Sequence, residues 1–140
     1  MTTEWMDKES KYYMFVVRRQ PVVIARGEGT RVWDVEDKEY LDFTSGWAVN
    51  NVGHANSVVA DAIAVQARTL LQTSNQFYTI PQLQLAEILV ENSALDKVFF
   101  CNSGAEANEN LLKMALAATG RSRVVCFEGG FHGRTAAAAA

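Results

Sequence analysis

The sequence has 140 residues, of which 49% are hydrophobic and 21% are charged, and its net charge is −3. This is ordinary globular composition with enough apolar side chains for one core, and the weak negative charge without a basic run excludes a general attraction to nucleic acid. No apolar run reaches the roughly eighteen residues of a membrane span, and the polar start lacks the blocks of a signal peptide. We therefore expect a cytoplasmic protein that binds neither nucleic acid nor membrane.

The N-terminal third is predicted to form an arm followed by a small antiparallel sheet. Residues 7–19 mix aromatic and charged side chains, which is typical of an arm or short helix that packs on its own chain or on another surface. Three β-prone runs begin near Val22, Arg31 and Tyr40 and are separated by polar turns. This pattern predicts a three-stranded meander, with Asp37 tolerating left-handed backbone in the second turn.

Residues 44–54 are predicted to form a loop that lines a cavity. The stretch is rich in small and amide residues but includes Trp47 and His54. Such a mixture suits the wall of a site better than a free linker. Without further context, His54 is a structural, hydrogen-bonded histidine, and we assign it no chemical role.

Two helices with broad apolar stripes are predicted next. Asn56 and Ser57 cap the first, whose apolar positions run from Val58 to Leu71, and Pro81 begins the second. We expect both stripes to lie in the core. The intervening loop contains Tyr78, which is either a contact at a binding site or an aromatic plug under the loop.

The pattern from residue 98 to residue 120 predicts a strand, a tight turn and a helix. Residues 98–100 are β-prone, Asn102-Ser103-Gly104 is a turn, and apolar residues then recur at helical spacing as far as Gly120. The N-terminus of such a helix suits a phosphate, which the Ser103 hydroxyl and the Gly104 and Ala105 amides would bind. An ordinary capped turn between a strand and a helix remains the alternative, and the motifs of P-loops and dinucleotide sites are absent.

A second predicted strand, residues 124–127, is followed by three side chains with binding chemistry. Phe131, His132 and Arg134 offer a flat ring, an imidazole and a guanidinium within four residues, at the sheet edge where α/β proteins bind ligands. Cys101 and Cys126 each fall inside an apolar strand, so we expect buried, reduced thiols.

Four segments in order resemble one enzyme family. The segments FFCNSGAEANENLLKMA and FEGGFHGRT, together with GEGTRVWDVEDKEYLDFTSGWAVNNVGH and LLQTSNQFYTIPQLQLAEIL, resemble the class III aminotransferases of pyridoxal-phosphate fold type I, most closely those of the acetylornithine and ornithine type. The resemblance covers the chain from about Tyr12 onward but only the N-terminal part of such an enzyme.

The resemblance implies an α/β fold and a division of the chain in two. Residues 1–55 would form the arm and the antiparallel meander. Residues 56–140 would begin the large domain that binds the cofactor, a three-layer α/β/α domain with a mainly parallel sheet that is incomplete here. A homodimer is expected for the full-length form.

The resemblance also implies a reaction and the residues that serve it. The cofactor would be pyridoxal 5'-phosphate (PLP), and an amino group would pass from an ω-amino donor such as N-acetylornithine to 2-oxoglutarate, in the biosynthesis of arginine. Residues fall into two groups: those that would bind the cofactor are Ser103, Gly104, Ala105, Phe131 and His132, and those that would bind substrate are Arg134 and Tyr78. Glu106 either orients the pocket or favours the helix dipole.

The chain lacks one part that the family's chemistry needs. None of its lysines matches the motif of the family's Schiff-base lysine, so no catalytic residue is assigned and we expect the 140-residue chain to be inactive alone. The alternatives are a non-catalytic module that binds the cofactor or forms a dimer, and another fold type I PLP enzyme such as an aminomutase or a decarboxylase. A phosphosugar-binding α/β domain is a third possibility.

Overall fold

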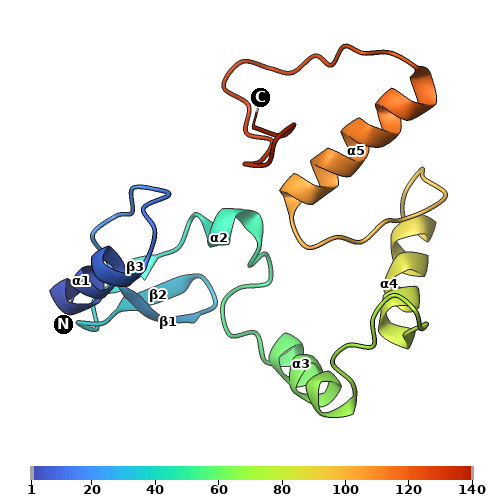
Figure 1. Ribbon diagram of the computed structural model, residues 1–140. Coiled ribbons are helices and arrows are strands. Elements are labelled where there is room, and N and C mark those ends of the chain that lie inside the picture. The colour runs from blue at the N-terminus through green and yellow to red at the C-terminus, as the bar shows by residue number, and fades with distance from the viewer. Residues whose placement is uncertain (1, 140) are drawn as a thin grey trace. The chain divides into compact units, whose positions relative to one another are not determined.

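We describe the fold from a computed structural model, which describes residues 2–139. The chain divides into two compact units, one ending at Gln72 and the other beginning at Thr73. Each unit is described separately, with the labels of Figure 1. The division expected at residue 55 concerns domains of the whole family and stays a prediction.

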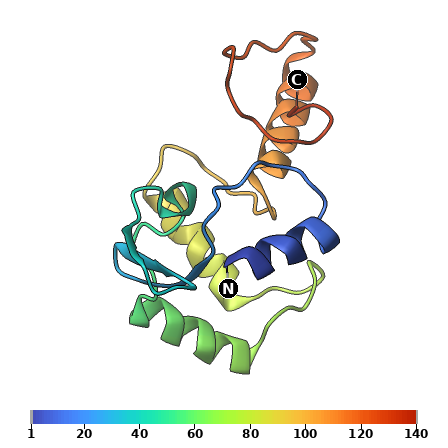
Figure 2. The same ribbon diagram turned by 90° about the vertical axis from the view of Figure 1, so that its left-hand side faces the viewer.

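The first unit begins with a helix and contains the expected meander. Helix α1 is Thr2–Tyr12, in which Lys8 donates to Glu4 one turn earlier at 2.9 Å. Strands β1 (Ile24–Glu28), β2 (Arg31–Asp34) and β3 (Glu39–Leu41) follow. They pair antiparallel in the order β1-β2-β3 (Figure 2), which confirms the predicted meander.

The turn between β2 and β3 is held by one carboxylate. Asp34 accepts hydrogen bonds from the amides of Glu36 and Lys38 and from the Tyr40 hydroxyl, at 2.8 to 3.0 Å. The Tyr40 hydroxyl is the main reason why the pKa of Asp34 is lowered. Asp37 has a φ of 63°, which is the left-handed conformation that an aspartate was expected to tolerate in this turn.

The meander leads through a left-handed turn into a helix. In α2 (Ser45–Ala48) all four residues have positive φ. Helix α3 (Ser57–Thr69) then begins at Asn56, whose side chain accepts from the Val59 amide at 3.2 Å. This confirms the predicted cap.

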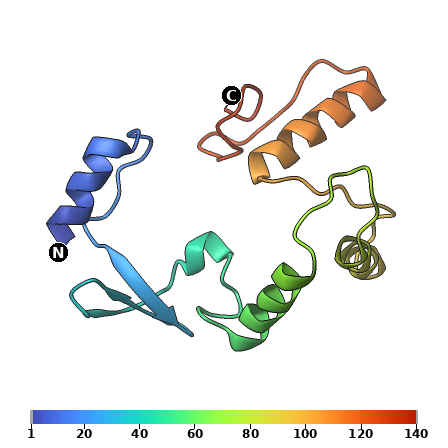
Figure 3. The ribbon, with the colours of Figure 1, turned by 60° about the horizontal axis from the view of Figure 1, so that its bottom comes forward.

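The second unit consists of two helices and the segments around them. Helix α4 (Ile80–Glu91) has Pro81 in its first turn, as expected, and α5 (Gly104–Thr119) ends at Gly120 in the left-handed conformation, with φ 65°. After Gly120 the chain doubles back along α5 (Figures 1 and 3). It ends in a turn in which the Ala139 amide donates to Thr135 at 2.9 Å.

The two strands predicted for the parallel sheet are not formed. Residues 98–100 and 124–127 have no strand conformation, and the strands of the meander are the only ones between residues 2 and 139. A strand is defined by hydrogen bonds to a neighbouring strand. Neither segment pairs with another strand in the described chain, so β-prone side chains alone do not make these residues strands.

The predicted core of α3 and α4 is also wrong for this structure. Val58, Ile63 and Leu83 are 76%, 63% and 54% exposed, and both cysteines are exposed. Within residues 2–139, β1 with β2 and β2 with β3 are the only pairs of elements in contact. An amphipathic stripe becomes core only when another element packs on it, and here none does.

Candidate cofactor site

The N-terminus of α5 is built by a reciprocal cap. The Ser103 hydroxyl oxygen accepts from the Glu106 amide at 3.2 Å, and the Glu106 carboxylate accepts from the Asn102 amide at 2.6 Å. The spacing Ser-x-x-Glu is the sequence signature of a capping box, and here the carboxylate accepts from the amide of the residue before the cap. Of the two interpretations of Glu106, the structure supports the one in which it stabilises the helix terminus.

Three hydrogen-bond donors remain available at this terminus. The amides of Gly104 and Ala105 open the helix and have no acceptor one turn earlier within it. The Ser103 oxygen accepts a hydrogen bond in the cap, so its own proton is free to donate. A Cβ built on Gly104 would meet nothing within 4 Å, so the space before these donors is open. An anionic group fits there.

The segment with Phe131, His132 and Arg134 lies against the same end of α5. The Asn108 side-chain amide donates to the His132 carbonyl at 2.6 Å. Gly133 packs so closely on the helix that an added Cβ would stand 2.7 Å from the Ala105 Cβ, and its φ is 140°. The structure therefore brings the two segments together, side by side along α5 (Figures 1 and 3).

The side chains of this second segment are left without protein partners. Phe131 is 79% exposed. The Nε2 atom of His132 is buried and has no hydrogen bond from any described residue. Arg134 is exposed and forms none of the ion pairs found between residues 2 and 139.

One predicted site residue is not brought to this place. Tyr78 is 94% exposed, and no hydrogen bond found in the described chain connects it to α5 or to residues 131–134. The interpretation of Tyr78 as an aromatic plug is wrong for this structure, because a plug would be covered.

Two residues that support the site were missed by the sequence reasoning. Asn108 and Glu109 contact the segment after Gly130, and both lie on the face of α5 that carries Ala105. Positions i, i+3 and i+4 share one face of a helix, so two polar side chains in register with a small one could have indicated a packing surface for a loop.

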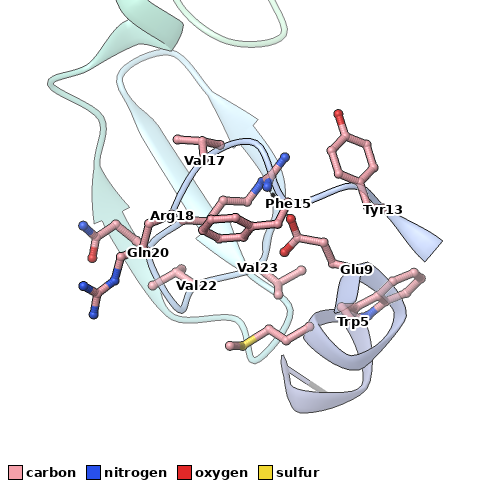
Figure 4. Close-up of a pocket in the computed structure, with 11 residues that line it drawn as sticks. Trp5, Glu9, Tyr13, Phe15, Val17, Arg18, Gln20, Val22 and Val23 are labelled. Carbon is pink, nitrogen blue, oxygen red and sulfur yellow. Dashed lines mark hydrogen bonds and ion pairs between the residues drawn. The ribbon is translucent and has the colours of Figure 1, made fainter. Parts of the chain in front are cut away.

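Two hollows lie elsewhere in the structure. One, of about 440 Å³, lies between α1 and the arm that follows it (Figure 4), with Trp5, Tyr13 and Phe15 in its wall. The other, of about 380 Å³, is lined by Leu112, Leu116 and neighbours on the C-terminal half of α5. Neither includes a predicted site residue. The described residues contain no cluster of three or more potential metal ligands and no helix long and apolar enough to cross a membrane.

His54 is a structural histidine, as expected. Its Nε2 atom is 2.7 Å from an oxygen of Asp42, and its backbone pairs with Gly29 in both directions, at 2.8 and 3.0 Å. Asp42 also accepts from the Thr44 hydroxyl and from the amides of Thr44 and Ser45. Together these donors, His54 first, hold the pKa of Asp42 well below its usual range.

Comparisons with known proteins point to one family. The family described as aminotransferase class-III matches residues 13–140. An acetylornithine aminotransferase from Methanocaldococcus jannaschii is 51% identical over 139 residues, which covers 94% of this chain and 34% of the relative.

Two solved structures resemble the fold. The ornithine aminotransferase from Toxoplasma gondii has a TM-score of 0.87 and 28% identity, covering 99% of this chain and 34% of that one. The acetylornithine aminotransferase from Elizabethkingia anophelis has a TM-score of 0.76 and 37% identity, covering 81% of this chain and 30% of that one.

The chain thus belongs to the class III aminotransferase family, whose members are PLP-dependent enzymes of fold type I. It spans about a third of the length of the relatives that it matches. It corresponds to their N-terminal part and carries the small antiparallel sheet.

The residues present at the end of α5 fit PLP. Its phosphate would meet the open donors of Ser103, Gly104 and Ala105, and its ring would find the exposed face of Phe131. The Nε2 atom of His132 has no hydrogen bond from any described residue, but it is buried in this structure, so the fit rests on the open helix terminus and on Phe131.

Proposed function

We propose that this chain supplies the phosphate- and ring-binding part of a PLP-dependent aminotransferase of the acetylornithine type. The amino donor would be an ω-amino acid such as N-acetylornithine and the acceptor 2-oxoglutarate, in arginine biosynthesis, by a cytoplasmic homodimer. Relatives named acetylornithine aminotransferase support the donor. The single observation that carries the proposal is the hydrogen bond from Asn108 to His132, because it joins two segments with complementary chemistry.

In this proposal the α5 terminus binds the phosphate. Ser103 donates its hydroxyl proton, Gly104 and Ala105 donate their amides, and the positive end of the helix dipole adds attraction for the dianion. The capping box keeps the hydroxyl oxygen fixed on the Glu106 amide, so the proton donor is already oriented. When bound, PLP supplies an electron sink for the bonds broken at the amino-acid carbon.

The remaining side chains would hold the ring and the substrate. Phe131 stacks on the pyridine ring and His132 lies beside it. Arg134, which has no protein carboxylate in the described chain, binds the carboxylate of the amino acid in two parallel hydrogen bonds. We propose Tyr78 as a further substrate contact, and its ring is exposed and available.

A titration with PLP tests the proposal. The absorption of PLP should shift on addition of the chain and saturate at one site, and Ser103→Ala should weaken binding several-fold. Pyridoxal, which lacks the phosphate, should bind much more weakly. A chain that causes no spectral shift would contradict the proposal and favour an inert module. Equal affinity for simple phosphate esters would favour a phosphosugar-binding domain.

A trapping experiment tests whether the chain acts alone. Borohydride reduction in the presence of PLP should leave no stoichiometric adduct at any single lysine, because none of them matches the family's catalytic motif. Lys8, for example, is held in an ion pair on the surface of α1. A stoichiometric adduct at one lysine would overturn this expectation.

A further inference from the structure

We propose that Asn108 and Glu109 are positioning residues, which fix Phe131, His132 and Arg134 before the N-terminus of α5. This inference rests on the proposed function and extends it to residues that touch neither cofactor nor substrate. It is carried by contacts on both sides of Arg134.

The contact before Arg134 is made by Asn108. Its side-chain amide donates to the His132 carbonyl at 2.6 Å across 24 residues of sequence, and the contact is partly buried. Asn108 engages the backbone carbonyl of His132 and not its ring, and the buried imidazole Nε2 has no partner among the described residues. Asn108 thus holds the backbone at His132 without forming a hydrogen bond to the imidazole.

The contact after Arg134 is made by Glu109. Its carboxylate accepts from the amides of Ala137 and Ala138, at 2.9 and 3.4 Å. The Thr135 hydroxyl and these amides hold the pKa of Glu109 below its ordinary value. An anion at the first amides of a turn satisfies donors that have no acceptor of their own.

Ala105 provides the third contact on the same helix face. Gly133 lies so close to it that no side chain would fit between them. Residues 105, 108 and 109 therefore hold the chain at Gly133, His132 and the final turn. Arg134 sits between fixed backbone points while its own guanidinium forms no ion pair in the described part of the chain. Such pre-organisation favours two-point binding of a carboxylate.

The test compares variants along α5 in the full 140-residue chain. Asn108→Ala and Glu109→Ala each remove one contact, and Glu109→Gln keeps an acceptor oxygen. The matched control is Asn110→Ala, which loses only a hydrogen bond to Glu106 within its own helix. Three quantities are measured: hydrogen exchange of the Ala137 and Ala138 amides, the dissociation constant for PLP, and that for inorganic phosphate.

We expect Glu109→Ala to speed exchange at both amides about tenfold or more, the change that follows loss of a hydrogen bond to a charged group. Glu109→Ala and Asn108→Ala should both weaken PLP binding several-fold, and Glu109→Gln should restore part of it. Phosphate binding should be unchanged, because the donors of the helix terminus are intact. A general loss of structure would instead weaken both ligands.

Two results would overturn the inference. One is an exchange rate in Glu109→Ala equal to that of Asn110→Ala. The other is faster exchange without any loss of PLP affinity, which would make the contacts purely structural. Failure of the proposed function itself is distinguishable, because the unaltered chain would then not bind PLP at all, whatever the exchange rates.

Discussion

The two histidines of the chain lie in polar clusters of opposite kinds. At His54 the ring nitrogen is paired with Asp42 at 2.7 Å, and Asp42 has three further donors. At His132 the buried ring nitrogen has no partner among the described residues, and three donors at the nearby helix terminus are open.

The difference separates a structural cluster from a binding site. A satisfied network fixes a backbone, and the His54 cluster fixes the start of α2 on the meander through Asp42 and Gly29. An unsatisfied buried group costs stability unless something fills its position. Polar groups left open beside one another are therefore the better indication of where a ligand binds.

The largest expected effect is at Gly133, where the segment of residues 131–134 packs on α5. Gly133→Ala adds a Cβ 2.7 Å from that of Ala105, at a φ of 140°. Overpacking and backbone strain should lower the local free energy of opening by about 2 to 4 kcal/mol. Hydrogen exchange at Ala138 measures this change.

Gly129→Ala is the matched control for Gly133→Ala. Gly129 also has a positive φ, of 74°, but a Cβ there meets nothing within 4 Å. Gly129→Ala therefore introduces backbone strain without a steric contact, and it should change the hydrogen exchange of the Ala138 amide only slightly. Equal exchange in both variants would contradict the close packing of Gly133 on α5.

Replacing each histidine by leucine tests the comparison itself. His54→Leu should lower the thermal midpoint of the first unit by several degrees, because Asp42 loses a donor. His132→Leu should not lower the midpoint of the second unit, because its buried nitrogen has no partner to lose, yet it should weaken PLP binding. Circular dichroism measures the thermal midpoints, and the PLP titration measures the affinity. Equal midpoint losses would remove the distinction between the clusters.

Removing the N-cap side chains of α3 and α5 should give two smaller effects that can be compared directly. Ser103→Ala and Asn56→Ala each remove a side-chain acceptor from a helix N-terminus, and each should cost about 1 kcal/mol. Ser103→Ala alone should reduce PLP affinity. If Asn56→Ala reduced it equally, the effect would reflect helix stability and not the phosphate site.

The last expected effect is the acid response of Asp42. Because its pKa is lowered in the folded chain, its stabilisation is fully present above the ordinary aspartate pKa of about 3.9 and is lost as the pH falls below that value. The difference in thermal midpoint between the unaltered chain and Asp42→Asn should shrink on acidification over this range. A difference that is constant with pH would mean that the carboxylate charge contributes nothing.

The sequence predicts local structure well and packing poorly here. Caps, turns and the meander depend on residues close in sequence, so the roles of Asn56, Pro81 and Gly120 were each predicted correctly. Parallel strands and helix stripes depend on distant partners, and residues 98–100 and the apolar face of α3 have none in this structure. Their patterns indicate a capacity for pairing that the described chain does not use.

At the candidate site, the residue types were predictable and their supports were not. Ser103, Gly104 and Ala105 follow from turn and cap chemistry. The contacts of Asn108 and Glu109 reach 24 and 28 residues along the sequence, and no local pattern specifies such pairs. The resemblance to aminotransferases indicated that the two segments meet, and the hydrogen bonds of α5 show how.

The most direct test of the account is a titration of the isotopically labelled chain with PLP, followed by nuclear magnetic resonance. The amide signals of Gly104 and Ala105 and the ring signals of Phe131 should shift together with one dissociation constant. The His54 ring should not respond. Signals of the helix terminus and of Phe131 that moved with different constants, or did not move at all, would contradict a single cofactor site.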